Sequence, residues 1–283
     1  MHPFEALDVP KGALGIHWFG QNSFAIKDPV GTVVQIDPYF PRHRPPERFI
    51  HPEPPLDESE LPTDFVLLTH DHGDHTCIES LRRIHAAFPD AHFLGPIESA
   101  EHMAEEGLPE DRIQAVEPAD TVDLGTMKAH AVWSKPPYGA PEDGIRPPDV
   151  THLGYVIEAQ KVRVYVTGDL INTFARHDEL VDPVASLMPD IGLLTTHPTE
   201  GEFPYFEGSI TLALKLGLDA AVPAHYDCFV KRTYDPKEWA ACFPSNGPRP
   251  IIIPYNQAIL YVPERTRGPR TPFASSQNWS CND

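Results

Sequence analysis

Residues 65–76 read Phe-Val-Leu-Leu-Thr-His-Asp-His-Gly-Asp-His-Thr. Four apolar residues, the length and character of a buried strand, lead directly into three histidines and two aspartates within six residues. Thr76 and Glu79 have the T-x-x-E spacing of a capping box, which predicts that a helix begins there. We therefore expect the polar cluster at a strand-to-helix turn, where α/β proteins usually bind ligands.

The spacing within this cluster predicts two metal ions. His70 and His72 are two residues apart in a turn and can direct both imidazoles at one point. Asp74 and His75 are adjacent, so their side chains diverge from that point toward a second centre. Imidazole and carboxylate ligands without a thiolate favour Zn²⁺, with Mn²⁺ or Fe²⁺ as alternatives.

Further ligands are expected at other strand ends. Asp169 follows the predicted strand 162–166, where its carboxylate is suited to bridging two cations, and His225 follows the predicted strand 220–223. A remaining ligand has three candidates. His152 is the first choice and His197 the second, which could contact substrate instead. His130 is the last choice, because it lies inside the alternating segment 128–133, a pattern typical of a half-buried strand.

The rest of the chain predicts an α/β fold of layered sheets and helices. Short apolar runs rich in β-branched and aromatic residues, bounded by Gly, Pro, Asp or Asn, are typical of strands. We predict strands over residues 14–19, 32–36, 65–68, 162–166, 191–194, 220–223, 251–253 and 259–262. Helical spacing of apolar residues predicts helices over residues 76–88, 96–107 and 209–216.

Composition limits the possible partners. The formal net charge of −19 disfavours sequence-independent binding to nucleic acid. Neither an apolar run of membrane-spanning length nor a secretory signal is apparent, so we expect a cytoplasmic protein without a membrane partner. Four widely spaced cysteines disfavour a disulfide framework. A small molecule is the expected partner, and association between copies of the chain is left open.

Proline is unusually abundant, with 33 residues in the chain, and it is concentrated in three regions. Residues 41–62 and 135–148 are too proline-rich for a strand or helix, so we predict surface loops that either connect strands or cover a site. Residues 263–283 read as a polar tail. Because no convincing boundary divides the chain, residues 1–262 are predicted to form a single domain.

The metal motifs resemble those of the metallo-β-lactamase superfamily. The H-x-H-x-D-H run at 70–75, Gly168-Asp169 and the late His225 occur in that superfamily's order. Segments 18–24, 36–39, 166–169 and 222–227 are similar to the branch that contains L-ascorbate-6-phosphate lactonase. This resemblance implies a four-layer αββα sandwich, with a dinuclear metal site at one edge of the two sheets.

The resemblance also implies hydrolysis of an ester, lactone, amide or phosphodiester bond. We expect a metal-bound hydroxide to attack the substrate, because a bound metal lowers the pKa of water to about 7. Asp74 would orient that hydroxide or accept its proton, and Asp71 would accept an imidazole N–H and fix the tautomer of a ligand histidine. Two cations balanced by Asp74, Asp169 and hydroxide leave a positive centre, which attracts an anionic substrate.

Several side chains near the predicted strand ends are candidates to hold that substrate. They are His197, Tyr226, Arg176 and Arg44, with Arg42, His43, His177, Lys231, Arg232, Lys135, Tyr138 and Arg146 as further choices. A lactone or a sugar-phosphate-like ester is the favoured substrate. The alternatives are a phosphodiesterase or phospholipase-type hydrolase, and a metal-binding scaffold without activity.

Overall fold

A computed structural model describes residues 2–264 of the chain. Most of the expected polar tail, from residue 265 on, lies outside these residues. Within them the strands form two sheets of seven strands each. The first has the order β14 (Gln257–Tyr261), β1 (Leu14–Trp18), β2 (Phe24–Lys27), β3 (Val33–Ile36), β4 (Phe65–Leu67), β5 (His92–Gly95) and β6 (Ile113–Ala115).

The second sheet has a similar plan. Its order is β13 (Arg249–Pro250), β12 (Ala220–Ala224), β11 (Ile191–Thr195), β10 (Val162–Val166), β9 (Leu153–Ala159), β8 (Met127–Trp133) and β7 (Thr121–Leu124). Both sheets are mixed. In the first sheet, β3 to β6 run parallel, and β14, β1 and β2 pair antiparallel with their neighbours. In the second sheet, β10 to β13 run parallel, and β7, β8 and β9 pair antiparallel with their neighbours.

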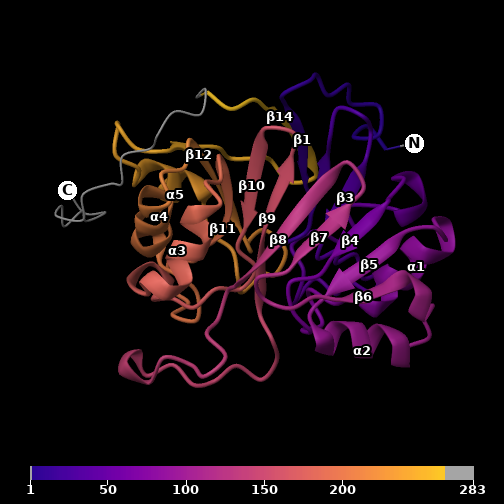
Figure 1. Cartoon of the computed structure of the whole chain (residues 1–283), viewed down its shortest axis with the longest axis horizontal. Helices are drawn as coiled ribbons and strands as arrows, with labels where there is room; N and C mark the ends of the chain where they lie inside the picture. The colour runs from indigo at the N-terminus through magenta and orange to yellow at the C-terminus, as the bar shows by residue number, and fades with distance from the viewer. Residues whose placement is uncertain (1, 265–283) are drawn as a thin grey trace.

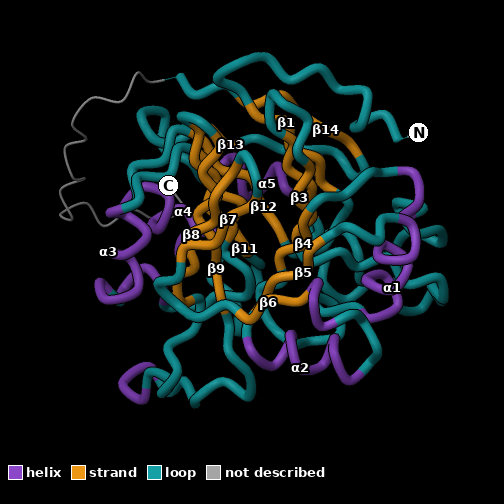
Figure 2. Tube along the Cα trace, turned by 45° about the vertical axis from the view of Figure 1, so that its right-hand side comes forward, coloured by secondary structure: helices purple, strands orange, loops and turns teal. Residues whose placement is uncertain are grey.

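The two sheets pack face to face, and helices cover their outer faces (Figures 1 and 2). Helices α1 (Ile78–Ala87) and α2 (Ile97–Glu105) lie on the first sheet. Helices α3 (Asp178–Ser186), α4 (Phe206–Lys215) and α5 (Pro236–Ala241) lie on the second. Four 3₁₀ turns occupy Glu58–Glu60, Glu110–Arg112, Pro141–Asp143 and Phe174–Arg176. This is the expected αββα sandwich.

Alternating side chains of one strand explain these layers. On β4, Leu67 joins the core between the two sheets, whereas Val66 points outward and packs with Leu81 and Ile84 of α1. Successive side chains of a strand point to opposite faces, so a strand that is apolar on both sides must be covered on both sides. The β4 strand, which precedes the histidines, is therefore packed against the other sheet on one face and against α1 on the opposite face.

Two local predictions were wrong. Thr76 does not cap α1: its hydroxyl donates to the carbonyl of His70 at 2.8 Å, and Cys77 is the N-cap residue. Glu79 instead accepts from the Arg83 guanidinium and the backbone N–H of Arg42. Residues 251–253 were expected to form a strand, but the ladder with β12 pairs only Arg249 and Pro250, and Ile253 is buried in the core outside any strand.

The two proline-rich loops differ in their packing. The loop over residues 41–62 is partly buried, because Phe49, Leu56 and Leu61 pack inward and Phe49 forms an isolated bridge with Phe229. The segment between β8 and β9, which contains residues 135–148, projects away from the sheets (Figure 1). No helix in the described part of the chain is long and apolar enough to cross a bilayer.

A buried histidine on β1 makes the stability of the fold depend on pH. His17 packs against His2 and Phe19, and its Nε2 lies 2.9 Å from Oδ1 of Asn256. Burial lowers the pKa of His17 to about 4, and the hydrogen bond to Asn256 offsets only part of that effect. Because the unfolded chain binds this proton more readily, stability is complete above the ordinary pKa of about 6.5 and is lost as the pH falls toward 4.

We therefore expect acid to destabilise the wild-type chain more than a His17→Phe variant. Between about pH 7.5 and about pH 5, the wild type should lose about 2 kcal/mol more of its free energy of unfolding. Urea unfolding of both proteins at the two pH values measures the difference. Equal losses in the two proteins would show that His17 does not carry this dependence.

Candidate metal centre

The polar residues predicted from the sequence meet where strands of both sheets end. Asp37 follows β3, His70 follows β4, Asp169 follows β10 and His225 follows β12. His152 precedes β9, which runs antiparallel to β10 and so begins at the same edge. Parallel strands present their carboxyl ends at one edge of a sheet, which is where open α/β sheets bind ligands.

Three overlapping groups of side chains are placed to hold cations. His70, His72 and His152 form one group, His70, His75 and Asp169 a second, and Asp74, His75 and His225 a third, each with ligand atoms within 4.8 Å of one another. Asp169 lies between them: its Oδ2 is 3.7 Å from Nε2 of His70, and its Oδ1 is 3.5 Å from Nε2 of His75 and 3.2 Å from Nε2 of His225.

The donor atoms at the centre of this cluster fit a metal ion. Nε2 of His70, Nε2 of His75 and Oδ1 of Asp169 are buried, and none has a hydrogen-bond partner within the described chain. Both ring nitrogens of His152 are also buried without a partner. Unpaired buried polar atoms are costly in a folded protein, so their convergence on one point indicates that a cation belongs there.

A buried carboxylate orients the inner histidines from behind. Oδ2 of Asp37 lies 2.8 Å from Nδ1 of His75 and accepts from the Thr69 hydroxyl at 2.7 Å. The same hydroxyl lies 3.0 Å from Nδ1 of His70. An N–H at Nδ1 of each ring leaves a lone pair on Nε2 for a metal. Asp37 therefore sets the tautomer of His75 directly and that of His70 through Thr69.

The pKa values of the inner groups follow from burial and charge. Burial lowers the pKa of His70 well below its ordinary value and that of His152 to about 3, so both imidazoles are neutral at pH 7. Burial opposes charge on His75 too, but Asp169 and Asp37 raise its pKa well above the ordinary value. Burial opposes charge on Asp169, yet His225 and His75 hold its pKa well below its usual range. A cation binding at this pair would displace the proton.

Two members of the cluster lie nearer the surface. The side chain of His72 is 35% exposed, and its Nε2 lies 3.1 Å from Oδ2 of Asp149. Asp149 lies near the end of the long loop between β8 and β9. The side chain of Asp74 is 22% exposed. His72 and Asp74 therefore form the solvent side of the centre, and the buried histidines and Asp169 form its inner side.

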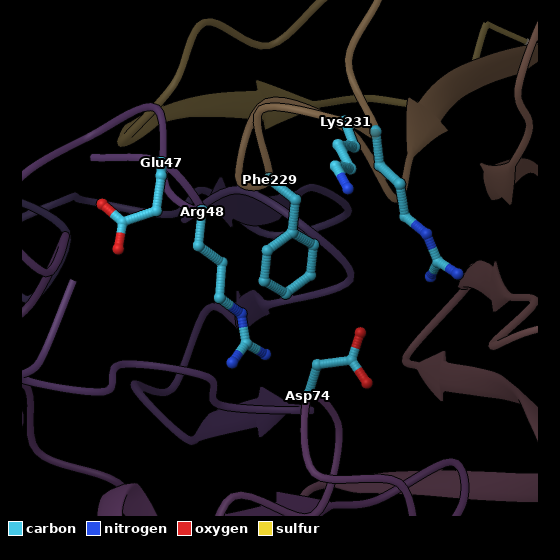
Figure 3. A pocket seen from close by; sticks show the side chains of 6 residues that line it. Glu47, Arg48, Asp74, Phe229 and Lys231 are labelled. Atoms are coloured by element: carbon cyan, nitrogen blue, oxygen red, sulfur yellow. The ribbon is translucent and has the colours of Figure 1, made fainter. Parts of the chain in front are cut away.

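A cavity of about 440 Å³ opens beside Asp74. Its lining combines three cationic side chains, two carboxylates and one aromatic ring: Arg48, Lys231, Arg232, Glu47, Asp74 and Phe229 (Figure 3). Arg232 is paired with Glu200 at 3.0 Å and with Glu202 at 3.4 Å. Among residues 2–264, no carboxylate lies within ion-pair distance of Arg48 or Lys231.

Of the three candidates for the remaining ligand, only His152 joins the cluster. Its ring stacks on His70 with 4.0 Å between ring centroids. His197 is buried after β11, where its Nδ1 accepts from the backbone N–H groups of Thr199 and Glu200. His130 lies on β8, where its Nδ1 contacts the Thr121 hydroxyl at 2.9 Å.

Several other predicted site residues lie elsewhere. Oδ1 of Asp71 lies 2.8 Å from Nδ1 of His102 on α2. Asp71 belongs to none of the three candidate ligand groups, although it lies between His70 and His72 in the chain. Tyr226 is buried between the rings of Trp18 and Tyr234. Neither residue lines the cavity.

Neither of the two predicted arginines lines the cavity. Arg44 is buried, donates to the carbonyl of His51 at 2.9 Å and lies 4.3 Å above the Phe49 ring. Arg176 is exposed at the end of a 3₁₀ turn beside Asp143. Sequence reasoning missed Arg48, which comes four residues after Arg44 in the same loop, and it gave no role to Asp37 although Asp37 follows an apolar strand as Asp169 does.

Comparison with known proteins agrees with this geometry. A family described as "Beta-lactamase superfamily domain" matches residues 32–226. A UPF0173 metal-dependent hydrolase of Methanopyrus kandleri is 26% identical over 229 residues, covering 79% of this chain and 89% of the relative.

Solved structures share the fold. The metallo hydrolase Igni18 of Ignicoccus hospitalis superposes with a TM-score of 0.66 at 20% identity, over 88% of this chain and 98% of that one. An isothiocyanate hydrolase from gut bacteria of Delia radicum gives a TM-score of 0.68 at 15% identity, over 88% and 99%. The family match covers more than half of the chain and every candidate ligand, and the chain therefore belongs to the metallo-β-lactamase superfamily.

Proposed function

We propose that this protein is a metal-dependent hydrolase that acts on an anionic lactone or a sugar-phosphate-like ester. One observation carries the proposal: the unpartnered buried atoms of His70, His75 and Asp169 converge beside a cavity that contains unpaired cationic side chains. The Methanopyrus kandleri relative is named a metal-dependent hydrolase, which is consistent with this assignment.

The donor groups suggest how two cations would be shared. His70, His72 and His152 would hold the first, and Asp74, His75 and His225 the second, with one oxygen of Asp169 facing each group. A bound divalent cation supplies Lewis acidity and makes hydroxide available from water near neutral pH. Zn²⁺ suits this set of nitrogen and oxygen donors, with Mn²⁺ and Fe²⁺ as alternatives.

Asp74 is the side chain best placed to handle a proton. In this structure its Oδ2 accepts from the Gln21 amide at 2.7 Å, whereas Oδ1 has no hydrogen-bond partner among the described residues. It is also the one candidate ligand that lines the cavity. We assign to Oδ1 the role of orienting the attacking water and accepting its proton, which the leaving oxygen of the opened ester or lactone then receives.

The cavity favours a substrate with a negative charge and an apolar part. The Arg48 guanidinium lies over the rings of Phe49 and Phe229, 5.3 Å from each ring centre, which holds it at the cavity wall. Lys231 adds a second unpaired charge, and Phe229 offers an apolar surface between them (Figure 3). A phosphate or carboxylate would pair with Arg48 and Lys231, with the scissile bond beside Asp74.

The same cationic wall would accept a phosphodiester, which makes a phosphodiesterase or phospholipase-type activity the second candidate. A metal-binding scaffold without activity is the third. The experiment reloads metal-free protein with Zn²⁺, Mn²⁺ or Fe²⁺ and measures turnover of neutral and phosphorylated lactones, aryl esters, a phosphodiester and a β-lactam. We expect metal-dependent cleavage of the phosphorylated lactone. Two bound cations without turnover of any substrate would favour the scaffold.

Variants of the cavity test the proposed substrate class. Arg48→Ala and Lys231→Ala should each raise KM for the anionic substrate about tenfold, because each removes one charge-assisted contact. The KM for a neutral lactone should not change. Lys215→Ala is the matched control, since Lys215 pairs with Asp178 away from the cavity. Equal effects on neutral and anionic substrates would contradict the role of these cations.

A further inference from the structure

The side chain of Gln21 lies inside one of the candidate ligand groups. Gln21 is in the turn between β1 and β2 and is 1% exposed. Its Nε2 is 2.7 Å from Oδ2 of Asp74 and 2.9 Å from Nε2 of His225. Asp74 and His225 belong with His75 to a single group. The amide therefore bridges two of the three side chains that would hold the second cation.

The backbone fixes this side chain in place. Gln21 has a φ of 54° and His225 a φ of 67°, both in the left-handed region that side-chain-bearing residues rarely adopt. Two backbone hydrogen bonds join the segments, from His225 N to Gln21 O and from Gln21 N to Tyr226 O, each 3.0 Å long. The Trp18 indole also donates to Gln21 O at 3.0 Å. Strained residues held by several contacts are characteristic of functional sites.

The other end of the amide is a carbonyl oxygen without a partner. Oε1 of Gln21 is buried and makes no hydrogen bond within the described chain. Rotation by 180° about the last side-chain bond exchanges Oε1 with Nε2, because the two halves of the amide have nearly the same shape. The oxygen would then lie beside the Asp74 and His225 donors, at a spacing suited to ligands of one cation.

We propose that Gln21 is a ligand of the second cation through Oε1. Without that cation, the amide N–H groups donate to Asp74 and His225; with it, the amide turns over and the oxygen coordinates. This inference rests on the two-cation site of the proposed function. A neutral amide oxygen adds a ligand without adding negative charge to the two carboxylates already present, and it suits hard cations such as Mn²⁺.

A purely structural role for Gln21 predicts the opposite effect on the affinity for the second cation. If Gln21 only fills the second site when no cation is there, removing its amide should strengthen cation binding. Gln21→Met removes both amide atoms at similar volume, whereas Gln21→Glu keeps an oxygen donor. Gln35→Met is the matched control, because Gln35 is also fully buried with an unpartnered Oε1 but contacts Thr63 instead of the cluster.

The test titrates metal-free protein with Mn²⁺ and Zn²⁺ by calorimetry, with bound metal counted by elemental analysis. We expect two cations in the wild type and in Gln35→Met. In Gln21→Met the second should bind at least about tenfold more weakly, while Gln21→Glu should bind it at least as tightly as the wild type. Equal or tighter second binding in Gln21→Met, or loss of it in Gln21→Glu, would overturn the assignment.

Two further outcomes separate this inference from the proposed function. If the wild type binds only one cation, both the two-cation site and the role of Gln21 fail. If it binds two and Gln21→Met also binds two equally well, only the role of Gln21 fails. A crystal structure of the wild-type protein with Mn²⁺ needs no variant. We expect Oε1 of Gln21 within coordination distance of the metal, and an amide oxygen turned away from the metal would overturn the inference.

Discussion

Asp169→Asn should weaken cation binding at both positions and reduce hydrolysis to the background rate. The oxygens of Asp169 lie 3.7 Å from Nε2 of His70 and 3.2 Å from Nε2 of His225, so one carboxylate serves both groups. The amide keeps the shape but removes the charge that balances the cations. We expect cation affinity to fall by at least about 100-fold, because even groups behind the ligands contribute 10–100-fold. Equilibrium dialysis followed by elemental analysis measures it.

A buried aspartate away from the cluster provides the control. Asp28 is 1% exposed, and its Oδ1 accepts from the backbone N–H groups of Val30, Gly31 and Thr32 in the turn after β2. Asp28→Asn should lower stability but leave the metal content unchanged. An Asp169→Asn protein that keeps two cations and full activity would contradict both the metal centre and the proposed function.

Asp37→Asn should weaken cation binding without removing a ligand. The Asp37 carboxylate accepts from Thr69 N, Thr69 Oγ1 and Asn22 Nδ2, and it contacts Nδ1 of His75 at 2.8 Å. An amide at position 37 would present an N–H to groups that are already donors. We expect cation affinity to fall about 10–100-fold, and the free energy of unfolding to fall by about 3–5 kcal/mol because a buried network loses its acceptor.

Thr69→Val separates the two arms of this network. It removes the hydroxyl between Asp37 and His70 but leaves the contact between Asp37 and His75. Its effect on cation affinity should therefore be smaller than that of Asp37→Asn. Calorimetric titration with Zn²⁺ and urea unfolding, applied to both variants, measure the two quantities. Unchanged cation affinity in Asp37→Asn would show that the histidines are oriented by other contacts.

The sequence predicted the strands best where buried residues alternate between two covered faces. Residues 65–68 are apolar throughout, and residues 162–166 are apolar except for the partly buried Arg163, because each strand packs against a sheet on one side and helices on the other. Less apolar strands were missed, among them β6, in which Ile113 is partly buried while Gln114 and Ala115 are exposed. These residues form a strand because they pair with β5, and the composition of the segment itself does not predict that pairing.

The candidate ligands were predictable because their chemistry is local. His70, His72, Asp74 and His75 are close in sequence, and Asp169 and His225 each follow an apolar strand. Local sequence could not decide among His152, His197 and His130, because all three histidines lie in or next to strands. Only the packing of the sheets places the ring of His152 against His70. The same applies to Asp71, whose partner His102 is 31 residues away on α2.

The sequence by itself determined the donor set and the strand ends that carry it, since residue type and hydrophobic period are properties of short segments. Only the tertiary structure decided which groups surround that set. Gln21, Asp37 and Arg48 reach the centre or its cavity from segments far from the H-x-H-x-D-H run. Contacts between distant segments depend on how the two sheets pack together, and no spacing along the chain records that packing.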